Sequence, residues 1–116
     1  MLLIYSQESS WTQAEMEACY VASTALIQEL DAAHQYVTAA PLQSISLATS
    51  VRIREGKRIL TDGPFAETRE QLGGFFLIDV PNLDVALEIA ARIPSSKKGT
   101  VEVRPVHELA GLPENN

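Results

Sequence analysis

The sequence predicts an α+β fold in which one antiparallel sheet carries two helices on a single face. Two observations predict it. Segments typical of strands are separated by just two long helical patterns, and the elements follow one another as β-α-β-β, a loop, then β-α-β. That order is typical of a ferredoxin-like sandwich. The 116 residues fit one domain, which we place at residues 1–110, with a flexible tail at residues 111–116.

Each element follows from apolar spacing and from the residues that begin or end it. Thr12 and Glu15 form a capping box before the first helix, and Pro94 stops the second helix. The Glu55-Gly56 pair turns the chain between two segments that predict a β-hairpin. Strands are expected at residues 2–5, 36–39, 49–54, 57–60, 73–80 and 100–105, and helices at residues 13–33 and 83–93.

Two helices on one face leave the opposite face of the sheet uncovered. Alternation along the strands gives the residues expected to line it, which are Tyr5, Val51 or Arg52, Phe75 or Phe76, and Val101 or Glu102. A sheet face that carries apolar residues without helix cover usually packs against a partner. We therefore expect a homodimer formed through this face.

Composition and charge exclude several function classes. A net charge of −6 and a pI of about 4.8 argue against binding to nucleic acid or to an anionic membrane surface. No apolar run is long enough to span a bilayer and no signal peptide is recognisable, so we expect a cytoplasmic protein. Cys19 is the single cysteine, and no spacing typical of metal ligands or of a phosphate-binding loop occurs. We therefore expect neither a metal nor a cofactor.

The loop after the predicted hairpin holds the candidate catalytic residues. Pro64 keeps Gly63 out of helical conformation, so the backbone around Asp62 is unusual. Asp62 either presents a carboxylate to a cleft as a base or acceptor, or shapes its own turn. Glu67 either pairs with Asp62 as an acid/base set, or is a solvated loop acid or the partner of Arg69 or Arg52 in an ion pair.

Four residues near this loop are candidates for ligand binding. Arg52 either binds an anionic ligand or is solvated, and Tyr5 either donates a phenolic hydrogen bond or packs in an interface. Phe65 either anchors the loop in the core or stacks on a ligand, and Pro64 lies beside it. A small anionic or aromatic molecule is the ligand that these side chains favour.

The central block of the sequence carries a family resemblance. DGPFAETRE at residues 62–70, followed by QLGGFFLIDV, closely resembles the signature of the DGPF branch of the YCII-related family. The resemblance covers nearly the whole chain. It implies a ferredoxin-like fold assembled as a dimeric α/β barrel with a cleft at the sheet face, a bacterial origin, and a functional link to an extracytoplasmic-function sigma factor.

The same resemblance bears on catalysis. The wider family is thought to use a His and an Asp, and one relative resembles a dehydrochlorinase. The family's His lies in the middle of the first helix, whereas the only candidate in this chain is His34 at its far end. His34 is better explained as a C-terminal residue in left-handed conformation. The His–Asp pair is therefore not expected to be intact.

Two functions follow from these observations. The first is a small-molecule-binding or regulatory homodimer, which the missing histidine favours. The alternative is a cofactor-free enzyme of lyase, dehydrochlorinase or hydrolase type that uses Asp62 in a dimer cleft, with Glu67 as acid and Arg52 holding an anion.

Overall fold

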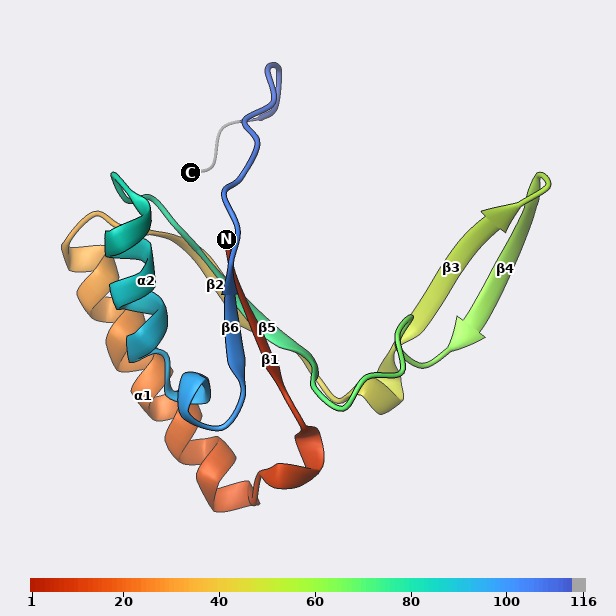
Figure 1. Cartoon of the computed structure of the whole chain (residues 1–116), viewed down its shortest axis with the longest axis horizontal. Coiled ribbons are helices and arrows are strands. Elements are labelled where there is room, and N and C mark those ends of the chain that lie inside the picture. The colour runs from red at the N-terminus through yellow and green to blue at the C-terminus, as the bar shows by residue number, and fades with distance from the viewer. Residues whose placement is uncertain (114–116) are drawn as a thin grey trace.

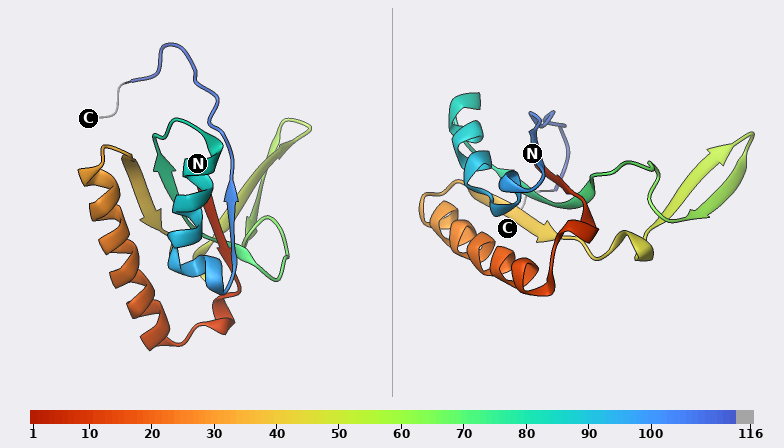
Figure 2. Two further views of the ribbon diagram at one scale, coloured as in Figure 1. Left: turned by 60° about the vertical axis from the view of Figure 1, so that its left-hand side comes forward. Right: turned by 60° about the horizontal axis from the view of Figure 1, so that its bottom comes forward.

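The computed structural model describes residues 1–113, which form two separate sheets and two long helices. The larger sheet is antiparallel, with the order β2-β5-β1-β6. Its strands are β1 (Leu2–Ser6), β2 (Tyr36–Pro41), β5 (Gln71–Ile78) and β6 (Thr100–Val103). α1 (Gln13–Ala32) and α2 (Leu83–Arg92) cover one face of it (Figures 1 and 2). Three short 3-10 turns complete the body: η1 (Glu8–Ser10), η2 (Ile45–Leu47) and η3 (Pro94–Lys97).

The hydrophobic core lies between this sheet and the two helices. Leu2 of β1 stands opposite Phe76 of β5 and Val103 of β6 in the strand register, and its side chain is fully buried. The buried cluster consists of Leu2, Leu26, Leu30, Phe76, Ile89, Ala90 and Ile93. Burying such side chains is the main favourable term in folding, so these residues fix how the helices sit on the sheet.

Both ends of α1 confirm the signals read from the sequence. Thr12 Oγ1 accepts from the Glu15 amide while the Glu15 carboxylate accepts from the Thr12 amide, both at 3.1 Å. His34 has a φ of +58°, and the Gln35 amide donates to the Leu30 carbonyl at 2.8 Å. That bond and the left-handed residue define a Schellman motif, so His34 terminates α1 as expected.

The smaller sheet is a hairpin that leaves the body of the molecule. β3 (Thr49–Arg54) pairs only with β4 (Lys57–Asp62), and we call residues 49–62 the arm. Glu55 and Gly56 both have positive φ at its tip, which is the conformation of a type I′ hairpin turn. At its root the Gly63 amide donates to the Ala48 carbonyl at 2.7 Å. The arm projects away from the sheet and helices, as Figure 1 and the right view of Figure 2 show.

The separate arm corrects one expectation about the uncovered sheet face. Tyr5, Phe75 and Glu102 alternate with core residues, so they lie on that face as expected. Val51 and Arg52 do not lie there, because their strand belongs to the arm and pairs with no strand of the four-stranded sheet. The four-stranded sheet is open, with β2 and β6 at its edges, and a single chain closes no barrel.

Two further features concern the ends and surface of the chain. Among residues 1–113, no helix is both long and apolar enough to cross a membrane. Beyond β6 the chain runs on as irregular, exposed backbone to Pro113. The tail expected at residues 111–116 falls partly on residues 114–116, which lie outside the described part of the chain.

Candidate functional site

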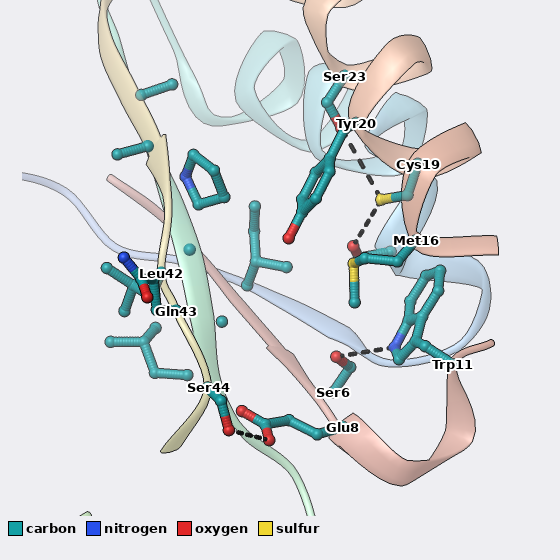
Figure 3. Close-up of a pocket in the computed structure, with 18 of the residues that line it drawn as sticks. Ser6, Glu8, Trp11, Met16, Cys19, Tyr20, Ser23, Leu42, Gln43 and Ser44 are labelled. Carbon is teal, nitrogen blue, oxygen red and sulfur yellow. Dashed lines mark hydrogen bonds between the residues drawn. The ribbon is translucent and has the colours of Figure 1, made fainter. Parts of the chain in front are cut away.

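A cavity of about 510 Å³ lies between α1 and the sheet, and we call it the helix-side pocket (Figure 3). Met16, Tyr20 and Ser23 face it from the helix. Leu26 and Leu30 of the same helix instead pack into the core. One helix therefore has two roles, since it forms a wall of the pocket and also closes the core.

Small residues on the sheet leave the room for this pocket. Ala39, Ala40 and Pro41 of β2 line it beside Gly73 and Gly74 of β5. A Cβ on Gly74 would stand 2.9 Å from the Ala40 carbonyl oxygen, so glycine is needed for the two strands to approach. Larger side chains at these positions would fill the space that remains open between the sheet and α1. Sequence reasoning missed this pocket.

Hydrogen bonds fix the polar groups at the lower end of the pocket. Trp11 Nε1 donates to Ser6 Oγ at 3.1 Å (Figure 3). The Glu8 carboxylate accepts from Ser44 Oγ at 3.0 Å and from the Ile45 amide at 2.7 Å. Among residues 1–113, Glu8 is the one acid that lines the pocket, and no Lys, Arg or His lines it. The described lining therefore offers Glu8 no second carboxylate, Lys or His with which to form a proton-transfer pair.

Two other polar side chains differ in whether they are free to meet a ligand. The Cys19 sulfur is buried and lies 3.7 Å from Ser95 Oγ, so it behaves as a small structural side chain. The Tyr20 hydroxyl points into the pocket (Figure 3) and has no hydrogen-bond partner within residues 1–113. Tyr20 is 45% exposed. Its position on the α1 stripe gave no sign of this role in the sequence.

Three of the residues expected to bind a ligand meet at a second cavity. Tyr5, Pro64 and Phe65 line a space of about 670 Å³ between the loop and the β1–β5 end of the sheet, which we call the loop-side pocket. The Arg52 guanidinium stacks on the Phe65 ring, 5.2 Å from its centroid. The four residues are therefore neighbours. Phe65 is 75% exposed, so the alternative in which it anchors the loop in the core is wrong.

The loop between β4 and β5 is held by hydrogen bonds to its own residues. Ser50 Oγ donates to the Gly63 carbonyl at 3.0 Å, and the Gln71 side-chain amide donates to the Ala66 and Thr68 carbonyls, each at 2.8 Å. Gly63 has a φ of +96°, which favours glycine. The loop is thus fixed mainly by Ser50 and Gln71.

The two candidate catalytic acids are not among the residues that line either cavity, although Glu67 lies between Ala66 and Thr68, which both line the loop-side pocket. Asp62 ends β4 opposite Thr49, and Glu67 is in the following loop; both are exposed. Neither lines the helix-side or the loop-side pocket of the single chain. Their catalytic role stays a prediction that depends on a second chain. Within the described residues, no group of three His, Cys, Asp or Glu side chains could hold a metal ion.

The fold and the site define a small α+β protein of ferredoxin-like type with an apolar pocket under its first helix. The model of the YCII-related domain matches residues 1–110. An uncharacterized protein of Rhizobium meliloti (strain 1021) is 36% identical over 110 residues, which are 90% of this chain and 89% of that protein. The chain belongs to the YCII-related family.

Proposed function

We propose that this YCII-related protein is a small-molecule-binding homodimer whose ligand occupies the helix-side pocket. The observation that carries the proposal is the pocket itself, an apolar cavity of about 510 Å³ with the Tyr20 hydroxyl directed into it. Ligand sites are typically apolar hollows of this size with a few polar groups that fix orientation. A regulatory role would follow from binding of this kind.

The lining of the pocket supports an uncharged aromatic ligand. Ile4, Ile27 and Phe76 offer apolar surface, and no cation lines the pocket to meet an anion. Tyr20 can exchange one hydrogen bond with a hydroxyl or carbonyl group on the ligand. The absence of a proton-transfer pair from this lining favours binding over catalysis.

The homodimer is supported by the uncovered sheet face. Leu3, Tyr5, Phe75 and Leu77 are all only half-buried in the single chain, although they sit on the central strands. Apolar side chains in the middle of a sheet gain free energy when a second sheet covers them. A dimeric α/β barrel of the DGPF type is the assembly that we propose for this face.

A second candidate function is the cofactor-free enzyme, a lyase or hydrolase that uses Asp62 in a dimer cleft. The observation that favours it is the loop-side pocket, where Tyr5 and Phe65 lie near the Arg52 guanidinium. An anionic aromatic substrate fits that set of groups. Turnover of such a substrate that Asp62→Asn abolishes would favour this function over binding alone.

The binding proposal is tested with the pocket's own fluorophore. Trp11 is the single tryptophan of the chain and lines the helix-side pocket, so its emission reports on occupancy there. Phenol and benzoate share one ring and differ in charge. We expect phenol to change Trp11 emission in a saturable manner, and the anionic benzoate to bind about tenfold more weakly, because its carboxylate would be desolvated with no cation in the pocket lining to pair with it.

Matched variants on α1 separate pocket binding from surface binding. Ser23→Phe fills the pocket, whereas Ala22→Phe places the same ring on an exposed position that does not line it. Ser23→Phe should abolish phenol binding and Ala22→Phe should preserve it. Tyr20→Phe should weaken binding by about tenfold through the loss of one hydrogen bond. Equal affinities in the two phenylalanine variants would overturn the assignment of the pocket.

A further inference from the structure

The two pockets lie against the same short stretch of chain. Ile4 lines the helix-side pocket and its neighbour Tyr5 lines the loop-side pocket, because successive side chains of a strand point to opposite faces of the sheet. Several residues at the end of β2 and the start of β5 line both pockets. They are Leu42, Gln43, Ser44, Gln71 and Leu72. The pockets are therefore neighbours at one end of the sheet.

The paired backbone is interrupted where the two pockets meet. The Leu42 amide donates to the Gly73 carbonyl at 2.8 Å, and the Gly63 amide donates to the Ala48 carbonyl at 2.7 Å. Between these two bonds, the described chain has no backbone hydrogen bond from residues 43–47 to residues 64–72. The loop-side pocket is lined by both of these segments, and we call the opening between them the passage. No paired backbone therefore separates the two pockets there.

The two ends of the passage differ in charge. On the helix side, the Glu8 carboxylate accepts from Ser44 Oγ, which lines both pockets (Figure 3). On the loop side, the Arg52 guanidinium stacks on the Phe65 ring. No ion pair within residues 1–113 involves Arg52, so its charge is available to an anion. A carboxylate is therefore repelled at the helix-side end and attracted at the loop-side end.

Two donors at the loop-side end suit a carboxylate. The planar guanidinium of Arg52 can donate two parallel hydrogen bonds to one carboxylate, and its stack on Phe65 restricts the side chain before a ligand arrives. Tyr5 lines the same pocket and carries a phenolic hydroxyl that can donate a third bond. Leu47 and Leu72 line the pocket as well, and they offer apolar surface to a methylene chain.

We propose that the ligand is an elongated carboxylate that occupies both pockets. Its uncharged aromatic end lies beside Tyr20 in the helix-side pocket, a methylene linker runs through the passage, and the carboxylate binds Arg52. The inference rests on the proposed ligand site in the helix-side pocket and extends that site. A carboxylate attached directly to the ring, as in benzoate, stays on the helix side and cannot reach Arg52.

The test compares a carboxylate with a hydroxyl end group at two ligand lengths. Phenol and benzoate form the short pair, phenylhexanol and phenylhexanoate form the long pair, and Trp11 emission of the full chain reports binding. Benzoate should bind about tenfold more weakly than phenol. Phenylhexanoate should instead bind about tenfold more tightly than phenylhexanol, because its carboxylate reaches Arg52. A long carboxylate that binds no better than the alcohol of the same length overturns the proposal.

Two matched arginine variants test the carboxylate end of the site. Arg52→Gln removes the guanidinium that stacks on Phe65. Arg54→Gln removes the same charge from the same face of β3, where Arg54 Nη1 donates to the Ile53 carbonyl. We expect Arg52→Gln to weaken phenylhexanoate binding by about tenfold and to leave phenylhexanol unchanged, and Arg54→Gln to change neither. Equal losses in the two variants would overturn the assignment to Arg52.

The passage itself is tested by filling it. Ala66 lines the loop-side pocket but not the helix-side pocket, so Ala66→Leu narrows the passage and leaves the space beside Tyr20 open. We expect this variant to bind both long ligands about tenfold more weakly and phenol with unchanged affinity, which also shows that it has folded. Long ligands that bind this folded variant as tightly as the wild type overturn the passage. If Ala66→Leu does not fold, the exposed Arg52→Gln variant still decides the proposal.

The position of the ring separates failure of this inference from failure of the proposed function. Ser23→Phe fills the helix-side pocket, so it should abolish binding of the long ligands together with phenol. Phenylhexanoate that still binds to Ser23→Phe would overturn the two-pocket site, while the proposed site for phenol stands. Phenol that fails to bind the wild-type chain would overturn the proposed function and this inference with it.

Discussion

The four-stranded sheet and the arm are built from similar strand sequences but have opposite surroundings. Leu2 on β1 and Phe76 on β5 are buried under the helices, whereas Val51 and Leu60, also directly paired, stand in solvent on the arm. The difference lies in what covers the strands and not in the strands themselves. Alternation identifies a strand and its faces, but the cover of each face is a property of the assembled molecule.

The difference in stability between the body and the arm should be largest when a large apolar side chain is removed from each of them. Leu30→Ala creates a cavity in the core and should lower the free energy of unfolding by about 2–5 kcal/mol. Ile53→Ala on the arm should change it by no more than about 0.5 kcal/mol in the monomeric chain, because the residue is exposed there. Urea unfolding at low protein concentration measures both. Similar losses from the two variants would mean that the arm is part of the cooperative core.

Substitution of one glycine in the body and one in the arm tests the same difference, with expected changes in the free energy of unfolding about half as large. A Cβ on Gly99 would overlap the Tyr5 carbonyl oxygen and come within 3.0 Å of Ser6 Cα. We expect Gly99→Ala to cost about 1–3 kcal/mol in global unfolding, because backbone atoms of β1 must shift. A Cβ on Gly56 would meet nothing within 4 Å, but the φ there is +74°.

The Gly56→Ala change should therefore strain the arm's turn by about 1–2 kcal/mol without touching the core. We expect faster amide exchange within the arm and an unchanged urea midpoint for the body. A lowered midpoint for this variant would show that the arm and the body unfold together. The two readouts, exchange and urea, separate the regions even though both substitutions are Gly→Ala.

The smallest expected effect concerns a surface ion pair of the body. Lys98 Nζ lies 2.7 Å from Glu15 Oε2, and this bond, together with the Thr12 cap, holds the pKa of Glu15 below its ordinary value of 4.5. A lowered folded-state pKa means that the contribution to stability is present above about pH 4.5 and is lost as the pH falls through the folded-state pKa. Lys98→Met should raise the Glu15 pKa toward 4.5.

An NMR titration of the Glu15 carboxyl group measures that shift. Lys57→Met on the arm is the matched control, and it should leave the Glu15 pKa unchanged because Lys57 lies at the far tip of the hairpin. If Lys98→Met also left the pKa unchanged, the Thr12 cap alone would account for the shift. The exposed position of the pair makes its effect on stability small and dependent on salt.

Much of the fold could be predicted because its signals are local. The capping box at Thr12, the end of α1 at His34 and the end of α2 before Pro94 each depend on a few neighbouring residues, and all three are confirmed. The order of strands and helices led to the ferredoxin-like arrangement because connection rules leave few alternatives. Strand and helix limits differ from those expected by no more than a few residues.

The separate arm and the helix-side pocket could not be predicted from local patterns. The β3–β4 hairpin itself follows from a local turn, but whether this hairpin joins the larger sheet is decided by contacts distant in sequence, and the alternation of β3 is the same in either case. The pocket arises from missing volume at Ala39 and Gly73, and small residues are not a chemical motif that a search for acids or histidines detects. Asp62 and Glu67 were selected because of their charge, yet neither side chain lines a cavity of the single chain.

The bond between Gly63 and Ala48 gives the arm the character of a removable module. Because the two ends of the hairpin already touch at 2.7 Å, the path of the chain through the body is nearly the same with the hairpin present or absent. Insertions and deletions are tolerated best where the ends of a segment meet at the surface. Evolution or design can therefore lengthen, shorten or exchange this segment while β1, β5 and the pocket under α1 stay as they are.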